Sequence, residues 1–295
     1  MTAGPQVLRT RVELAAALGP HGTTTVRRAV VMTMGALHEG HLALVRTARD
    51  HADQVVVTIF VNPLQFGAGE DLDRYPRDLG RDVDLLAAAG ADIVFAPEVG
   101  EVYPGGPPVV RVSAGVLGER LEGAVRPGHF DGVLTVVLKL LHLVHPDVAL
   151  FGQKDAQQLM AVRQMVHDLD LDVEIVAVPT VRDHDGVALS SRNAYLDPEQ
   201  RAAARALSRA LAAGRAAAGA GLAAPRIRSA AMDVLAAEPA VVVDYLALVD
   251  ASTADEVADD HQGPAVLAVA ARLGATRLID NVVLDLRGPA PEEDR

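Results

Sequence analysis

Runs of β-branched and other apolar residues alternate with segments of helical periodicity through the first half of the chain. The apolar runs predict five strands, at residues 29–32, 55–61, 93–96, 148–151 and 173–178. Apolar residues at three- and four-residue spacing predict helices between them, at residues 42–51, 79–89, 133–144 and 157–169. This alternation is typical of βαβ units, so we expect an α/β fold with a Rossmann-like parallel sheet and helices on both faces.

The second half of the chain follows a turn-rich stretch at residues 182–186 and is rich in alanine. A helix start is predicted by Asp197 as the N-cap, Pro198 at the first helical position and Gln200 in a capping box. The pattern then predicts two helices and three strands, at residues 199–217, 224–237, 241–249, 265–271 and 277–286.

These changes in pattern predict three parts of the chain. We expect a Rossmann-like domain over residues 1–182 and a lid with a smaller C-terminal α+β domain over residues 183–288. The turn-rich stretch at residues 183–186 is then a candidate hinge between them. Residues 289–295 are charged and are expected to form a disordered tail.

Composition and charge narrow the class of protein. The chain has 295 residues, of which 50% are hydrophobic and only 3% aromatic, so we expect aliphatic cores between helices and a parallel sheet. Its net charge of −12 argues against a nucleic-acid partner. The longest apolar run, residues 133–144, is interrupted by Lys139 and His142 and is too short for a membrane span. Without cysteine or an apolar leader after Arg9 and Arg11, a cytoplasmic location is expected.

Between the first predicted strand and the first predicted helix stands the segment TMGALHEGH, residues 33–41. Its small residues let a ligand approach the backbone, and a helix N-terminus offers N–H groups and partial positive charge to phosphate. His38 and His41 fall on one side of the first turn, where they can donate to one anion together. Taken alone, the segment leaves a metal pair or an ordinary loop open, although it lacks the H-E-x-x-H spacing of zinc sites.

Other polar segments lie at the ends of predicted strands. The sequence GQKD at residues 152–155 offers Lys154 as a charge for phosphate, although this segment taken alone slightly favours an Asp-capped helix. The sequence LSSRN at residues 189–193 can close over a triphosphate but is also common turn material. Gln65 and Gln158 are neutral amides suited to a small polyol acid. Doubly wound sheets bind ligands at strand carboxyl ends, so we expect these groups to meet there.

Six segments together resemble the motifs of pantothenate synthetases, in the same order and at similar spacing. They are residues 34–41, 60–66, 126–130, 132–141, 152–159 and 186–193. The resemblance covers about residues 25–285. It implies an ATP-dependent ligase that condenses pantoate with beta-alanine through pantoyl adenylate, releasing AMP and pyrophosphate. It also implies a homodimer of the nucleotidyltransferase superfamily whose Rossmann-like domain binds ATP and pantoate.

The resemblance also implies roles for individual residues. His41 corresponds to the catalytic proton donor, and His38, Lys154 and Arg192 to catalytic partners of the phosphates. Gln65 and Gln158 would hold pantoate. Mg²⁺ would balance the triphosphate, with Asp82 as its candidate ligand, direct or through water. The expected ATP contacts are Met34, Gly35, Ala36, Leu37, His38, Glu39, Gly40, His41, Gly152, Gln153, Lys154, Asp155, Val181, Leu189, Ser190, Ser191 and Arg192.

Four residues depart from the family pattern, and two other functions compete with the ligase. Proline, an acidic residue, glutamate and tyrosine are usual where this chain has Met32, Arg81, Gln153 and Ala156. These departures bear on loop rigidity, the magnesium environment and nucleotide affinity. The competing functions are a nucleotidyltransferase that stops after transfer to a phosphate, and a non-catalytic nucleotide sensor. The neutral glutamines argue against the first, and the intact histidines, lysine and arginine against the second.

Overall fold

The computed structural model describes residues 4–20, 25–67, 69–70 and 72–287. The chain forms two compact units. The first comprises Met1–Gln153 and Ala161–Pro179, and the second comprises Lys154–Met160 and Thr180–Arg295. The predicted tail over residues 289–295 lies outside the described residues.

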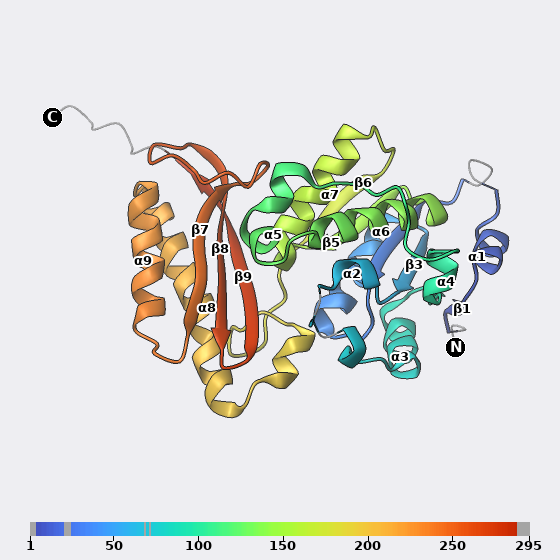
Figure 1. Ribbon diagram of the computed structural model, residues 1–295, viewed down its shortest axis with the longest axis horizontal. Coiled ribbons are helices and arrows are strands. Elements are labelled where there is room, and N and C mark those ends of the chain that lie inside the picture. The colour runs from blue at the N-terminus through green and yellow to red at the C-terminus, as the bar shows by residue number, and fades with distance from the viewer. Residues whose placement is uncertain (1–3, 21–24, 68, 71, 288–295) are drawn as a thin grey trace. The chain divides into compact units, whose positions relative to one another are not determined.

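A six-stranded parallel sheet forms the centre of the first unit (Figure 1). Its strands are β1 (Gln6–Leu8), β2 (Arg28–Thr33), β3 (Gln54–Ile59), β4 (Ile93–Phe95), β5 (Val148–Gly152) and β6 (Glu174–Val178). They lie in the order β1-β4-β3-β2-β5-β6, so the winding direction reverses between β2 and β5. A reversal of this kind is where doubly wound sheets bind ligands, beside the carboxyl ends of the strands.

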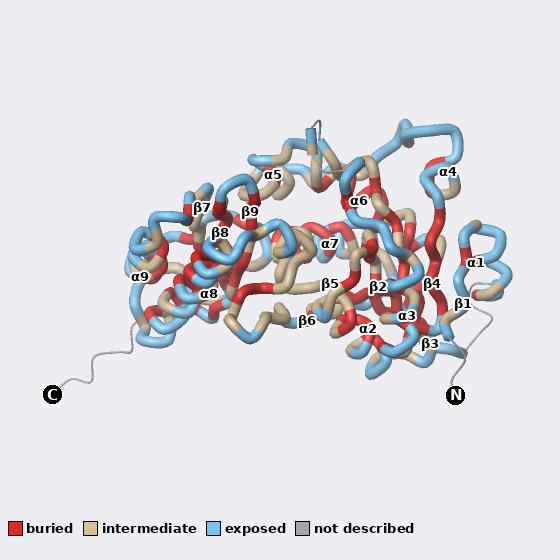
Figure 2. The backbone as a smooth tube through the Cα atoms, turned by 90° about the horizontal axis from the view of Figure 1, so that it is seen from below, coloured by how far each residue is buried: buried red, intermediate tan, exposed pale blue. Residues whose placement is uncertain are grey.

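Helices pack on both faces of this sheet, which confirms the predicted fold class. Helix α1 (Arg11–Leu18) packs against α6 (His129–Val144), and α2 (Glu39–His51) packs against α3 (Leu79–Ala89). The inner strands β2, β3, β4 and β5 are buried over nearly their whole length, as Figure 2 shows. Two-sided burial explains why the strands appear in the sequence as continuous aliphatic runs rather than as an alternating pattern.

Two further helices are short, and a third connects β5 to β6. They are α4 (Val99–Val102), α5 (Leu121–Val125) and α7 (Ala156–Asp168), with 3-10 turns η1 (Pro63–Gln65), η2 (Leu72–Arg74), η3 (Gly115–Glu119), η4 (Gln153–Asp155) and η5 (Ser191–Tyr195). Within the described residues, no helix combines the length and the apolar character needed to cross a membrane.

The second unit is the smaller α+β part expected from the sequence. Its antiparallel sheet has the order β7 (Val242–Asp250), β8 (Gly263–Leu273) and β9 (Thr276–Leu286). Helices α8 (Pro198–Gly219) and α9 (Ala224–Ala236) pack against each other and on these strands (Figure 1). One buried cluster joins the helices to the sheet through Leu207, Leu211, Ile227, Leu235, Leu248 and Leu267.

The element boundaries differ from the prediction mainly at helix starts. Helix α2 begins at Glu39 and α6 at His129, several residues before their apolar periodicity becomes visible. The capping box predicted for α8 is confirmed, since the Gln200 N–H donates to Asp197 at 2.8 Å and the Asp197 N–H donates to Gln200 at 3.2 Å. Neither β1 nor α1 was predicted. The strand β1 has only three residues and buries only Leu8, so it leaves little pattern in the sequence.

Candidate functional site

The loop between β2 and α2 turns sharply through two residues with positive φ. Gly35 has φ +84° and Ala36 has φ +52°. Only glycine adopts such a conformation without steric cost, so Ala36 must be held in place by its surroundings. Thr33 stabilises the turn, because its hydroxyl donates to the Thr58 carbonyl at 2.8 Å and accepts from the Gly35 N–H at 3.2 Å.

Asp82, in the first turn of α3, lies directly beneath this loop. Its carboxylate accepts from the Ala36 N–H at 3.0 Å and from the Leu37 N–H at 2.9 Å, one bond to each oxygen. The residue is 1% exposed. Both oxygens thus accept hydrogen bonds from the loop. The expected binding of magnesium by Asp82, direct or through water, stays a prediction. Among the residues that the structure describes, no group of three or more His, Asp or Glu side chains is arranged to hold a metal ion.

His38 and His41 form a reciprocal cap at the N-terminus of α2. The Nδ1 atom of His38 accepts from the Gly40 N–H at 3.2 Å, and Nδ1 of His41 accepts from the His38 N–H at 3.3 Å. The two rings lie 4.1 Å apart, centroid to centroid. Because each Nδ1 is an acceptor, the neutral ring carries its proton on Nε2. The histidines therefore present Nε2–H donors at a helix N-terminus, where the helix dipole favours an anion.

Gln65, predicted to bind pantoate, is positioned by the buried amide of Asn62. Asn62 Nδ2 donates to Gln65 Oε1 and to the Gly132 carbonyl, both at 3.1 Å. Its Oδ1 accepts from the Tyr103 hydroxyl at 2.8 Å. Burial raises the pKa of Tyr103, so this hydroxyl stays protonated and remains a donor. Gln65 Nε2 lies 3.0 Å from Met34 Sδ, and this contact brings the two predicted site segments together.

Arg126 and His129 hold the backbone of the same residue. Arg126 Nη2 donates to the Gln65 carbonyl at 3.1 Å, and Nδ1 of His129 lies 2.8 Å from the same oxygen. Arg126 also lies 3.1 Å from Nε2 of His129, which must accept because a guanidinium has only donors. Burial, and then the charge of Arg126, lower the pKa of His129. His129 is therefore neutral, with its proton on Nδ1.

Glu70 completes this group by pairing with Arg126. Arg126 donates to its carboxylate at 2.8 and 2.5 Å, and these bonds lower the pKa of Glu70. The sequence singled out residues 126–130 as a motif without giving them a role. Two residues of this motif, Arg126 and His129, hold the backbone of Gln65. The hydrogen bonds to the Gln65 carbonyl show this contact. Arg126 lies 61 positions and His129 lies 64 positions from Gln65 in the sequence, so no local pattern indicates it.

Of the predicted site residues in the second unit, Lys154, Asp155 and Gln158 lie in η4 and α7, and the others lie between β6 and α8. Lys154 follows β5, its carbonyl accepts from Asn281 Nδ2 at 2.7 Å, and its ammonium lies 3.5 Å from Asp155. Leu189 donates to the Val181 carbonyl at 3.0 Å. Ser190 caps η5 by accepting from the Arg192 N–H at 3.3 Å. Gln158 lies half-buried in the first turn of α7.

The predicted hinge segment, residues 183–186, is a closed turn bound to α8. Gly186 donates to the Asp183 carbonyl at 2.9 Å, and Asp183 donates to Val187 at 2.9 Å. Arg201 donates to Asp183 at 2.8 Å and to both oxygens of Asp185 at 2.8 Å. The pKa of Asp185 is lowered, chiefly by these bonds from Arg201. The predicted turn is confirmed, and its carboxylates pair with Arg201 of α8. Its role as a hinge stays a prediction.

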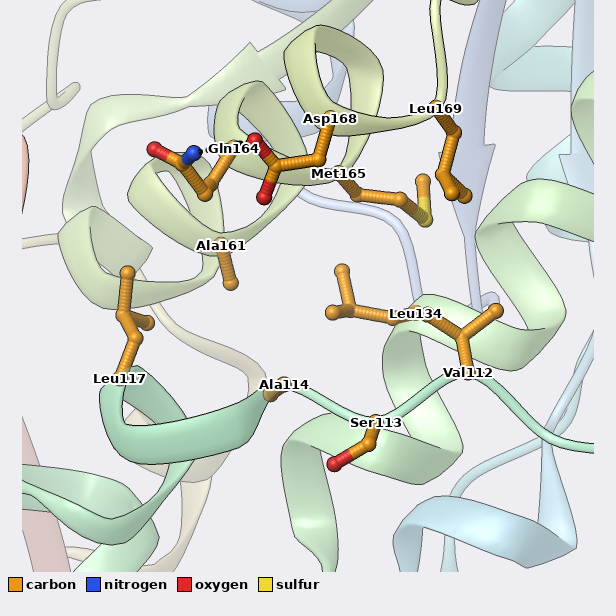
Figure 3. A pocket seen from close by; sticks show the side chains of 10 residues that line it. All are labelled: Val112, Ser113, Ala114, Leu117, Leu134, Ala161, Gln164, Met165, Asp168 and Leu169. Carbon is orange, nitrogen blue, oxygen red and sulfur yellow. Dashed lines mark hydrogen bonds between the residues drawn. The ribbon is translucent and has the colours of Figure 1, made fainter.

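A separate pocket of the first unit lies between α6, α7 and the segment before η3 (Figure 3). Its lining is Val112, Ser113, Ala114, Leu117, Leu134, Ala161, Gln164, Met165, Asp168 and Leu169. None of these is a predicted site residue. The amide of Gln164 and the carboxylate of Asp168 in this lining pair with each other, since Gln164 donates to Asp168 at 2.7 Å. The loop at the N-terminus of α2 is therefore the stronger candidate site.

Comparisons with known proteins identify the family to which this chain is similar. The family model described as pantoate-beta-alanine ligase matches residues 6–283. Pantothenate synthetase from Streptomyces coelicolor is 56% identical, over 95% of this chain and 96% of its own length. The crystal structure of pantothenate synthetase from Thermus thermophilus has 51% identity and a TM-score of 0.88, over 94% of this chain and 98% of that one.

A second solved structure contains bound ligands. It is pantoate-beta-alanine ligase from Francisella tularensis, complexed with beta-gamma ATP and beta-alanine. It is 30% identical to this chain, covers 97% of it and 100% of its own length, and has a TM-score of 0.77.

Proposed function

This chain belongs to the pantoate-beta-alanine ligase family, and we propose that it activates pantoate as an acyl adenylate at the loop between β2 and α2. It is an ATP-dependent ligase that condenses pantoate with beta-alanine to give pantothenate. A carboxylate is a poor acyl donor in water, so amide formation requires a better leaving group. Attack of a pantoate oxygen on the α-phosphorus supplies AMP as that group and releases pyrophosphate.

The single observation that carries this proposal is the pair of Nε2–H donors at the start of α2. Both Nδ1 atoms accept backbone N–H groups, so the rings are fixed in orientation as well as in tautomer. Transfer to an α-phosphorus is catalysed mainly by positioning and by stabilising developing charge. His41 is proposed as the proton donor and His38 as a phosphate partner. Lys154, Ser190, Ser191 and Arg192 are proposed to contact the phosphates.

The second chemical step needs no covalent help from the protein. The neutral amine of beta-alanine attacks the carbonyl of the mixed anhydride, and AMP leaves with the electron pair of the broken bond. The chain contains no cysteine, which agrees with a route that uses no thiol nucleophile. Mg²⁺ is proposed to bind the triphosphate oxygens and neutralise their charge.

The remaining departures from the family pattern leave the proposed donors in place. Arg81 is exposed on α3, beside the buried Asp82. Met32 lies inside β2 and pairs with Thr58 of β3, so it extends the strand up to the loop. Gln153 and Ala156 flank Lys154 at η4 and at the start of α7.

A homodimer and a cytoplasmic location are also proposed. The segment before η3 exposes Val109 completely and Val110 by 85%, and η3 itself exposes Val116 by 62%. Adjacent exposed aliphatic side chains are costly in water, and a second copy of the chain can cover them. Sedimentation of the purified protein at several concentrations tests the dimer.

The function itself is tested by following AMP formation. ATP, Mg²⁺, pantoate and beta-alanine should together yield AMP and pantothenate in equal amounts, and omission of any one should abolish pantothenate formation. A nucleotidyltransferase of the simpler kind would instead retain the nucleotide in its product. AMP formation that does not depend on pantoate would reject the ligase.

Replacing either glutamine with alanine should raise the pantoate requirement while leaving the ATP requirement nearly unchanged. Each lost hydrogen bond should cost about 0.5–1.5 kcal/mol of binding free energy. Steady-state kinetics of Gln65→Ala and Gln158→Ala, with each substrate varied in turn, measure the effect. Gln164→Ala is a control on the same helix as Gln158, because Gln164 is exposed and bonds to Asp168 one turn away. A larger change for ATP than for pantoate would place these amides elsewhere.

A further inference from the structure

The buried carboxylate beneath the loop is a feature that the proposed reaction does not use. Asp82 belongs to α3, and its own N–H donates to the Asp78 carbonyl at 3.0 Å. Its two oxygens accept from consecutive residues of the loop, at 3.0 Å from Ala36 and 2.9 Å from Leu37. Bonds from N–H groups to a charged carboxylate are shorter and stronger than those between neutral groups. The carboxylate therefore fixes two successive peptide planes.

These are the peptide planes that most need to be fixed. Ala36 has φ +52°, a conformation that side-chain-bearing residues rarely adopt. Gly35 precedes it with φ +84°, and a Cβ placed there would lie 3.0 Å from Asp82 Oδ2 and 3.3 Å from Ile59. The bonds to Asp82 thus hold the backbone of Ala36 in a conformation that it would otherwise leave. The space around Gly35 leaves little room for a side chain.

The same bonds decide which groups of the loop can serve a ligand. The N–H groups of Ala36 and Leu37 are committed to Asp82. These two N–H groups are therefore not offered to a phosphate, and the side-chain donors that follow them are the imidazoles of His38 and His41 at the start of α2. The direction of these rings depends on the peptide planes that Asp82 holds, because His38 directly follows Leu37.

We propose that Asp82 is a positioning residue that sets the nucleotide-binding conformation of the loop between β2 and α2. This inference rests on the proposed function of that loop. Asp82 acts through the N–H groups of Ala36 and Leu37, and not as a direct ligand of magnesium. An aspartate at this place is required because both of its oxygens accept. An asparagine would turn an amide N–H₂ toward one of the two N–H donors.

The test separates nucleotide binding from metal binding. The dissociation constant of AMP is measured by calorimetry in EDTA for the wild-type protein and for Asp82→Asn. The Mg²⁺ concentration for half-maximal activity is measured at saturating ATP. We expect AMP binding without metal to weaken at least tenfold in Asp82→Asn, with the Mg²⁺ requirement unchanged. Asp84→Asn removes the same charge from the exposed face of the same helix and should change neither value.

A second variant covers the case in which Asp82→Asn does not fold. Gly35→Ala disturbs the same contact from the loop, because the new Cβ meets Asp82 Oδ2 and the backbone has positive φ. It should give the same loss of metal-free AMP binding. Unchanged AMP binding combined with a raised Mg²⁺ requirement in Asp82→Asn would make Asp82 a metal ligand and overturn the inference. Unchanged values for both quantities would overturn it as well. If the wild-type protein itself does not bind AMP, the proposed function of the loop fails first.

Discussion

His41→Ala is expected to lower the rate of pantoate adenylation roughly 10²–10³-fold, the range for removing one preorganised donor to developing charge. The loss should appear in kcat as well as in kcat/KM, because the Nε2–H of His41 is proposed to stabilise charge that develops during transfer. Release of AMP from ATP and pantoate, measured with saturating substrates, gives the rate. His142→Ala is a control, since His142 is an exposed histidine on α6.

The capping role of His41 requires a second variant. His41 Nδ1 accepts from the His38 N–H, so alanine also removes a helix cap, which costs about 0.5–2 kcal/mol of stability. Glutamine at this third helical position can accept the same N–H in a capping box. His41→Gln should therefore keep the stability of the wild-type protein and still lose most of its adenylation rate. Near-normal turnover by either folded variant would remove His41 from the reaction.

Gly132→Ala is expected to have the second large effect, on both stability and pantoate binding. A Cβ at Gly132 would lie 2.1 Å from the Leu64 carbonyl oxygen and 2.9 Å from the Gln65 nitrogen. These are backbone atoms, so no side-chain rotation relieves the overlap. Either α6 or the turn that carries Gln65 must move. Overpacking of this kind costs typically about 1–3 kcal/mol, and a backbone clash belongs at the upper end of that range.

The measurement for Gly132→Ala combines denaturant unfolding with pantoate kinetics. The free energy of unfolding should fall, and the KM for pantoate should rise in the protein that remains folded, because the turn supports Gln65. Gly80→Ala makes the same change in the first turn of α3, where the nearest atom to the new Cβ is Asp78 Oδ1 at 3.8 Å. The control should be neutral or slightly stabilising. Equal behaviour of the two variants would show that α6 does not confine this turn.

The fold was predictable from the sequence where local pattern and tertiary environment agree. The buried strands β2, β3 and β5 appear as aliphatic runs because both of their faces are covered, and helix periodicity placed α3 at its observed bounds. The helix start at Asp197 was predictable because a capping box is a local interaction. By contrast, β1 is a three-residue strand that pairs with β4 across more than 80 residues, and nothing in its own sequence indicates that pairing.

The candidate site was predictable to the extent that its chemistry is carried by short motifs. The loop with His38 and His41 could be found because small residues and histidines stand between a strand and a helix. The supporting residues could not be identified in the same way. Asn62 bonds to Gly132, 70 positions away, and Asp82 bonds to Leu37, 45 positions away. Such contacts depend on the folded chain, so the sequence alone did not indicate the hydrogen bonds that Asp82 and Arg126 make.

The order of bond making is the central chemical claim, and isotope transfer tests it most directly. Pyrophosphate exchange into ATP, with Mg²⁺ and pantoate but without beta-alanine, should occur because the adenylate forms reversibly and is shielded from water. Omission of pantoate should stop this exchange. With oxygen-18 in the pantoate carboxylate, full turnover should transfer label into AMP, since the attacking oxygen becomes bonded to the α-phosphorus and leaves with it. Label found in pyrophosphate or inorganic phosphate, with none in AMP, would contradict the adenylate mechanism even if pantothenate were formed.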